Sequence, residues 1–329
     1  MRSLHGSSAA NSDGRGSKRS LFRWMRRYAA PVLALAATST LAGFEVARFQ
    51  GGARWSSANL VEASSLTANP ARSVVVDPSV DTFSRLAPQE QAEHLLERAI
   101  ARDPESLDMI GKDVDGWRGH LRNTDRLFDL VHSALNSDDM RVRSSALEID
   151  LAANNLSKSP DTVARLVKKL HESPADRPWT LWRLGALGNR GVQPELVLAQ
   201  LLTYVHDRNE ETRFWAVEGL GVLGTDASID SLLDRFAHDS SARIRERAAS
   251  NVAQAGMLSR EQRLAAVPQL LNFFDDDALD SATRGWVYGA LRLITGVQLG
   301  NDANAWRKWW ATRDTASKHT HIRTKTLYA

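Results

Sequence analysis

The feature that most constrains this chain is a helix-start pattern that recurs between Asp138 and Trp310. In the three clearest copies, small or apolar residues lie three and seven places after an arginine, which is the spacing of one helical face. The copies begin at Arg143, Arg213, Arg245 and Arg284. A further copy has Thr180 in the arginine position. The starts are about 32–39 residues apart, a period typical of helical solenoids.

Start and stop signals divide this region into helical pairs. Prolines followed by an acidic residue mark helix starts at Pro160 and Pro194, and glycines such as Gly224 mark helix ends. We therefore expect helices at 139–155 with 160–171, 177–188 with 194–206, 210–223 with 227–237, 241–256 with 260–274, and 281–295 with 302–311. Stacked pairs of this kind share one continuous apolar interior.

The repeats are predicted to occupy residues 138–312. Residues 88–137 are expected to form N-terminal capping helices, with a polar loop at about 110–117 that Trp117 holds in place. At the other end, three rings share one helical face and can close the core: Trp306, Trp309 and Trp310. The tail, 313–329, is predicted to be disordered.

Three stretches carry a resemblance to a known family. They are Asp139–Leu147, Asn209–Gly221 and Ser241–Ala249, and they resemble HEAT repeats, including the short bacterial form named after phycobilisome lyases. The resemblance covers roughly residues 120–312. It implies an all-α fold, a right-handed α–α superhelix, in which most members are scaffolds and a few are enzymes.

The net charge of +3 hides an uneven distribution of charge. Residues 1–27 contain seven basic side chains and one acidic one, Asp13. An uncharged run of about 17 residues follows, at the short limit for crossing a bilayer. We predict a disordered basic segment at 1–27, a transmembrane helix or signal sequence at 28–49, and a flexible linker at 50–87.

Three interpretations of residues 28–49 remain open: an uncleaved membrane anchor, which we favour, a cleaved export signal, and a buried helix of a soluble domain. The basic segment before it favours a single-pass protein whose C-terminal body lies outside the cytoplasm, in the periplasm of a bacterium. Export after signal cleavage is the alternative.

Two sets of recurring residues invite a functional interpretation, and we expect both to be structural. The repeated arginines have turn acids within reach and are expected to form salt bridges. His171, His206 and His238 occupy equivalent places before a turn. Neighbouring helices are ~8–10 Å apart, too far for one ion to join ligands on successive repeats, so we expect helix capping and no metal site.

The favoured function is a non-catalytic scaffold that binds a protein or peptide partner on its concave face, with no cofactor and no nucleic acid. Exposed aromatic and arginine side chains are typical anchors of such surfaces, and the candidates are Trp182, Trp215, Arg183 and Arg213. The alternative is a HEAT-fold enzyme, similar to a bilin lyase or a DNA glycosylase. The chain has no cysteine, which excludes disulfides, thiolate metal sites and a cysteine nucleophile.

Overall fold

The computed structural model describes residues 83–313, and all the regular secondary structure in that range is helical. The predicted basic segment, membrane or signal helix and disordered tail lie outside the described residues, as does nearly all of the predicted linker. Within residues 83–313, no helix is long and apolar enough to cross a bilayer.

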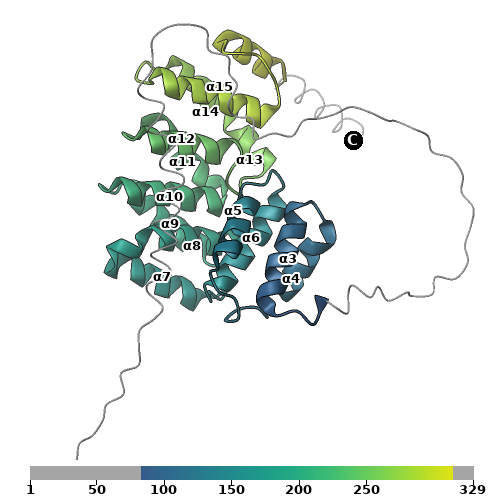
Figure 1. Ribbon diagram of the computed structural model, residues 1–329. Coiled ribbons are helices and arrows are strands. Elements are labelled where there is room, and N and C mark those ends of the chain that lie inside the picture. The colour runs from purple at the N-terminus through teal and green to yellow at the C-terminus, as the bar shows by residue number, and fades with distance from the viewer. Residues whose placement is uncertain (1–82, 314–329) are drawn as a thin grey trace, which may run out of the picture. The chain divides into compact units, whose positions relative to one another are not determined.

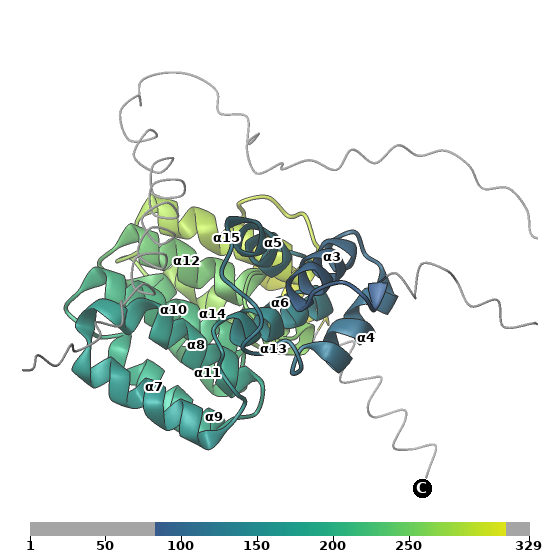
Figure 2. The ribbon, with the colours of Figure 1, turned by 60° about the horizontal axis from the view of Figure 1, so that its bottom comes forward.

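The first four helices form what we call the N-terminal block: α3 (Pro88–Ile100), α4 (Pro104–Asp113), α5 (Asp125–Leu135) and α6 (Met140–Ala153). Helix α6 packs against the other three members of this block. Their shared core contains side chains that are fully buried, such as Leu95, Leu96 and Ile110. Figure 2 shows the block beside the remaining helices.

The later helices form what we call the stack: α7 (Pro160–Glu172), α8 (Arg177–Asn189), α9 (Pro194–Tyr204), α10 (Glu210–Leu223), α11 (Asp226–His238), α12 (Ala242–Ala253), α13 (Arg260–Ala265), α14 (Val267–Asn272) and α15 (Ser281–Thr295). Short 3-10 turns precede α8 at Pro174–Asp176 and follow α14 at Phe273–Asp275. Residues 303–313 form a closing helix.

The stack has two layers. In the first layer α8 packs on α10, α10 on α12 and α12 on α15. The second layer contains α7, α9 and α11, which follow one another along the stack in Figure 1 and pack mainly on first-layer helices. The predicted helical repeat architecture is therefore present, and the helix bounds of the stack agree closely with those expected from the sequence.

Glycines allow the closest approach within the first layer. A Cβ atom placed on Gly185 of α8 would lie 2.3 Å from the carbonyl oxygen of Gly219 in α10, closer than any real contact. The two backbones therefore touch directly at this crossing. A side chain at either position would force the helices apart.

Three expectations from the sequence were wrong. The polar loop expected at about 110–117 is instead helical as far as Asp113. It is the end of α4, which begins at Pro104 because Asp103 caps its first turn and Pro104 occupies the first helical position. The expected helix 260–274 is divided into α13 and α14 near Pro268, whose ring removes a backbone donor.

The third error concerns pairing. We expected α6 and α7 to form a hairpin, but α6 packs within the N-terminal block whereas α7 packs on α8. Local periodicity places apolar faces on both helices. It does not state which neighbour each face meets, because that choice depends on the rest of the core.

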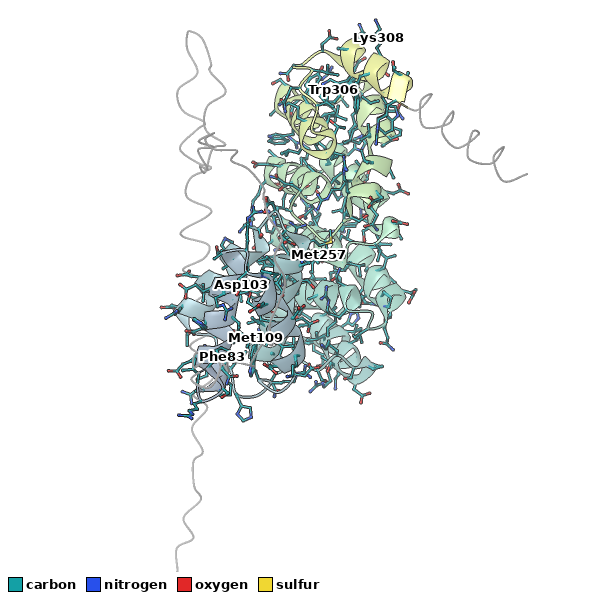
Figure 3. The ribbon with its side chains drawn as sticks, turned by 90° about the vertical axis from the view of Figure 1, so that its right-hand side faces the viewer. Phe83, Asp103, Met109, Met257, Trp306 and Lys308 are labelled. Atoms are coloured by element: carbon teal, nitrogen blue, oxygen red, sulfur yellow. The ribbon has the colours of Figure 1, made fainter. Side chains whose placement is uncertain are left out.

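The closing helix seals the end of the stack, as its tryptophans predicted. Trp306 is fully buried, and its indole Nε1 donates to the Gly300 carbonyl at 3.0 Å. Figure 3 shows Trp306 inside this end of the molecule and Lys308 at its surface. Trp309 contacts Trp306 with ring centroids 5.9 Å apart.

Candidate functional site

The repeated arginines form a ladder of bonds that joins successive repeats. Arg213 donates to both carboxylate oxygens of Asp239, at 3.0 and 3.1 Å, and Arg245 bonds to Asp280 at 2.6 Å. Each carboxylate belongs to the turn of the next repeat. Arg213 and Arg245 also donate to the carbonyl six residues before them. The predicted structural salt bridges are confirmed here, and Arg213, whose side chain is 12% exposed, is a structural link of the stack.

In the repeat that has Thr180 in the arginine position, another arginine makes the equivalent contacts. Arg177, three residues before Thr180, donates through Nε to the Leu170 carbonyl at 3.0 Å. Its guanidinium lies 3.7 Å from Asp207 of the next turn. The ladder therefore continues through this repeat, although the alignment of helix starts had not revealed it.

For Arg143 the expectation of a salt bridge was wrong. Its side chain is buried and donates to the Ser137 carbonyl, while its Nε atom has no hydrogen-bond partner among residues 83–313. Burial lowers the pKa of Arg143. The reason is topological: α6 belongs to the N-terminal block, so no further repeat stacks on it to present a carboxylate.

Aromatic rings gather where α8 and α10 begin, and we call this group the aromatic–arginine cluster. Trp179 lies 6.3 Å from Trp182 and 4.8 Å from Trp215, measured between ring centroids. Phe214 meets Trp215 edge to face at 5.8 Å. The cluster comprises Trp179, Trp182, Phe214 and Trp215 with the charged residues Arg183, Glu211 and Arg243.

The charged members border the rings. The Arg243 guanidinium lies 3.8 Å from the centroid of Phe214 and donates to Glu211 at 2.7 Å. Glu211 also accepts a bond of 2.7 Å from the Trp215 indole. Arg183 lies 5.7 Å from the Trp179 ring. Trp179 is half-exposed, and a half-exposed ring with arginines beside it is an arrangement that favours protein contacts.

The expectation that Trp182 and Trp215 are exposed was wrong. Their exposed fractions are 5% and 3%, because each ring packs against Trp179 and Trp215 also packs against Phe214. Trp179, which was not among the candidates from the sequence, is the half-exposed ring of the four. Helical spacing alone could not distinguish these rings, since adjacent aromatic residues point in several directions around one helix.

Arg183 also takes part in a polar seam between α6 and α8. It donates to the Asn154 side chain, and its Nε lies 3.8 Å from Asp150. Further along, Arg190 donates to Ser144 at 2.6 Å and Glu148 at 3.3 Å. Burial raises the pKa of the Asp150 carboxyl, although the charge of Arg183 and a bond from Asn154 oppose this shift.

A second charged group faces the N-terminal block from α10 and α12. Arg247 bonds both oxygens of Glu218, and the Asn251 side chain donates to the Val217 carbonyl at 3.1 Å. Burial alone would lower the pKa of Arg247, but the Glu218 carboxylate raises it. In α5, burial and the nearby charge of Arg247 lower the pKa of His132. Arg247 of the first layer therefore lies close enough to α5 for its charge to act on the His132 ring.

Beside the seam lies an open groove of about 640 Å³. It is bounded by α4, α6, the end of α8 and the loop residue Met257, which Figure 3 labels. Its basic side chains are already engaged: Lys158 bonds Glu148 at 2.9 Å and Arg141 bonds Asp139 at 3.0 Å. The groove is thus amphipathic and nearly balanced in charge.

The histidine positions are not equivalent in the structure. His238 bonds two carboxylates through its ring nitrogens, Asp234 at 3.2 Å and Asp276 at 3.1 Å. Through these bonds His238 joins α11 to the turn that contains Asp276, whereas we had expected it to cap its own helix. His171 and His206 are exposed.

Residues 163–253 match HEAT repeats. The matched range runs from the first turn of α7 to the end of α12, which is the most regular part of the stack. This match supports the HEAT-repeat family and a helical repeat scaffold. Neither the curated proteins nor the solved structures gave a match to the chain.

Proposed function

We propose that this protein is a non-catalytic scaffold at the cell envelope, and that it binds a protein or peptide partner on the first layer of the stack. The observation that supports this most directly is the aromatic–arginine cluster. Trp179 presents an aromatic surface beside Arg183, while Arg243 and Glu211 border the adjoining rings of Phe214 and Trp215 with groups that donate and accept hydrogen bonds. Protein interfaces are enriched in Trp and Arg and have polar rims.

The charge of this face supports a protein in preference to a nucleic acid. In the aromatic–arginine cluster, Arg243 is paired with Glu211, and Arg183 lies 3.8 Å from Asp150. Binding to a phosphate backbone requires a surplus of positive charge, whereas these arginines are individually neutralised. A partner with both a donor and an acceptor beside an apolar anchor suits the cluster better.

The proposed location depends on residues 28–49 and on the seven basic side chains before them. In this proposal residues 28–49 anchor the chain in the membrane, and the stack lies outside the cytoplasm. Fractionation of cells that express the full chain with a C-terminal tag tests this directly. The tag should sediment with membranes and be accessible to protease from the outer side, and a tag in the soluble cytoplasmic fraction would contradict it.

The binding surface is tested by crosslinking and pull-down with the full chain. Arg243→Glu should reduce recovery of a specific partner at least tenfold, because it places like charges at Glu211 and removes the cation over Phe214. Lys308→Glu provides the control, since this exposed residue lies on the closing helix. Equal recovery with both variants would show that the cluster is not the binding surface.

A further inference from the structure

Helix α9, in the second layer of the stack, has an exposed apolar face. Three large apolar side chains are exposed in residues 83–313, and two of them lie on α9: Leu196, 40% exposed, and Leu202, 36% exposed. Ala199 and Thr203 are exposed beside them. Helix α9 contains a single charged residue, Glu195. Its solvent face is therefore an apolar stripe.

The two neighbouring helices of this layer have charges of opposite sign. Helix α7 carries three cations and two acids, and its exposed cations include Arg165 and Lys168. Helix α11 carries three acids, including Asp230 and Asp234, and one arginine. The face thus changes from basic through apolar to acidic along the direction in which α7, α9 and α11 follow one another in Figure 1.

Two of these charges have no ionic partner among residues 83–313. Arg165 donates only to the Thr162 hydroxyl, at 3.1 Å, and Asp230 makes no ion pair. Lys168 is held only by an exposed contact of 3.7 Å with Glu172. Asp234 bonds Arg235 and His238 on its own helix.

We infer that this face binds a second copy of the same chain, α9 against α9, around a two-fold axis parallel to the helices. A two-fold axis brings the same patch of both copies together, so the patch must complement itself. With the axis parallel to the helices, α7 of one copy meets α11 of the other, and opposite charges face each other. With the axis across the helices, α7 would meet α7 and like charges would repel.

The register of the three helices fits this arrangement. Lys168, Leu202 and Asp234 are each the ninth residue of their helix, so they lie at one level of the layer. Arg165 and Asp230 lie about one turn earlier, at a common level with Ala199. Rotation about an axis parallel to the helices does not shift a residue along the helix direction. The basic residues on α7 of one copy therefore lie opposite the acidic residues on α11 of the other.

The size of the face is sufficient for a weak dimer. Helices of 11–13 residues at a rise of ~1.5 Å and a spacing of ~8–10 Å give roughly 500 Å² per copy. The total of about 1,000 Å² is near the lower limit for a specific interface. We therefore expect dimers that dissociate on dilution.

The absence of cysteine from the chain makes the geometry directly testable. In cells that express the full chain and are treated with a mild, membrane-permeable oxidant, Ala199→Cys should form a disulfide dimer, because this residue lies at the centre of the stripe. Ala282→Cys, at an exposed position of α15, is the control and should stay monomeric. A yield for Ala199→Cys no higher than the control would overturn the inference, whether lipid or another protein covers α9.

Mixed pairs test the direction of the axis. Arg165→Cys and Asp230→Cys should not crosslink when expressed alone, but should form a mixed disulfide when two differently tagged copies are expressed together. Self-crosslinking of Arg165→Cys would contradict the axis.

Charge exchange gives a second readout. Arg165→Asp should lower the yield of the Ala199→Cys dimer severalfold, and adding Asp230→Arg to the same chain should restore it. A failure to restore would contradict the pairing of α7 with α11. These results do not depend on the aromatic–arginine cluster, so they separate this inference from the proposed function.

Discussion

Helix α8 packs against α10 and against α6 through different kinds of contact. On one side α8 meets α10 through the backbone at Gly185 and Gly219. On the other side α8 meets α6 through polar side chains, among them Arg183 with Asn154 and Arg190 with Ser144. The first contact is apolar and leaves no space, whereas the second is made of hydrogen bonds and partly exposed charges. The stack should therefore resist separation more strongly than the seam to the N-terminal block.

The largest effect should come from breaking the buried bond between α10 and the next turn. Asp239→Ala leaves Arg213 without a carboxylate at a site where the Asp239 side chain is 1% exposed. Loss of one partner of a buried ion pair costs about 3–5 kcal/mol of unfolding free energy. Urea unfolding followed by circular dichroism measures this.

The exposed pair Arg102–Asp138, whose side chains are 71% and 76% exposed, is the matched control. Asp138→Ala should cost less than about 1 kcal/mol. Similar losses for the two variants would show that burial does not distinguish the ladder from the surface.

The glycine crossing should give the next largest effect. Gly185→Ala places a methyl group where the Gly219 backbone already lies, and overpacking of this kind costs about 1–3 kcal/mol. Gly289→Ala in α15 is the control, because nothing lies within 4 Å of the added atom. It should stabilise the chain by up to about 1 kcal/mol, since Ala favours a helix. Thermal unfolding of both variants measures this difference. Equal changes in Tm for Gly185→Ala and Gly289→Ala would show that the close approach of α8 and α10 does not decide the effect.

A change in the polar seam between α6 and α8 should have the smallest effect on the unfolding free energy, and this effect should depend on pH. Burial raises the pKa of Asp150 above its ordinary value of 3.8. As pH rises past that value, the unfolded chain loses this proton before the folded chain does, so Asp150 progressively destabilises the fold. Below about pH 3.8, both states are protonated and the contribution disappears.

Asp150→Asn remains neutral at every pH and isolates this contribution. The unfolding free energy of the variant relative to the natural chain should increase between pH 4 and pH 7, by about 1 kcal/mol or less. Urea titrations across this range measure the difference. A difference that falls with rising pH would mean that the attraction between Asp150 and Arg183 outweighs the cost of burial.

The sequence was sufficient to place most helices because their ends carry local signals. Asp139, Asn209 and Asp280 each cap the helix that follows, and the predicted starts lie within a residue of these caps. The same local reasoning failed at Asp103-Pro104. There Asp103 caps α4 and Pro104 is its first residue, although we had expected a loop at about 110–117.

The candidate site was harder to predict because it depends on contacts between distant residues. Trp179 and Trp215 are in different repeats, and which ring covers the other is fixed by the crossing of α8 and α10. The substitution of Arg177 for the missing ladder arginine is likewise visible only when Asp207 is in place. Periodicity identifies residues on a helical face but does not say what that face meets.

The most direct test of the scaffold account is site-specific photo-crosslinking in living cells. A photoreactive phenylalanine analogue in place of Trp179 in the full chain should produce one dominant protein adduct, and Arg243→Glu in the same chain should abolish it. The same analogue at Leu293, which is 55% exposed on α15, serves as the reference position. Adducts that are equally abundant at both positions, or an adduct at Trp179 that Arg243→Glu leaves unchanged, would contradict the account.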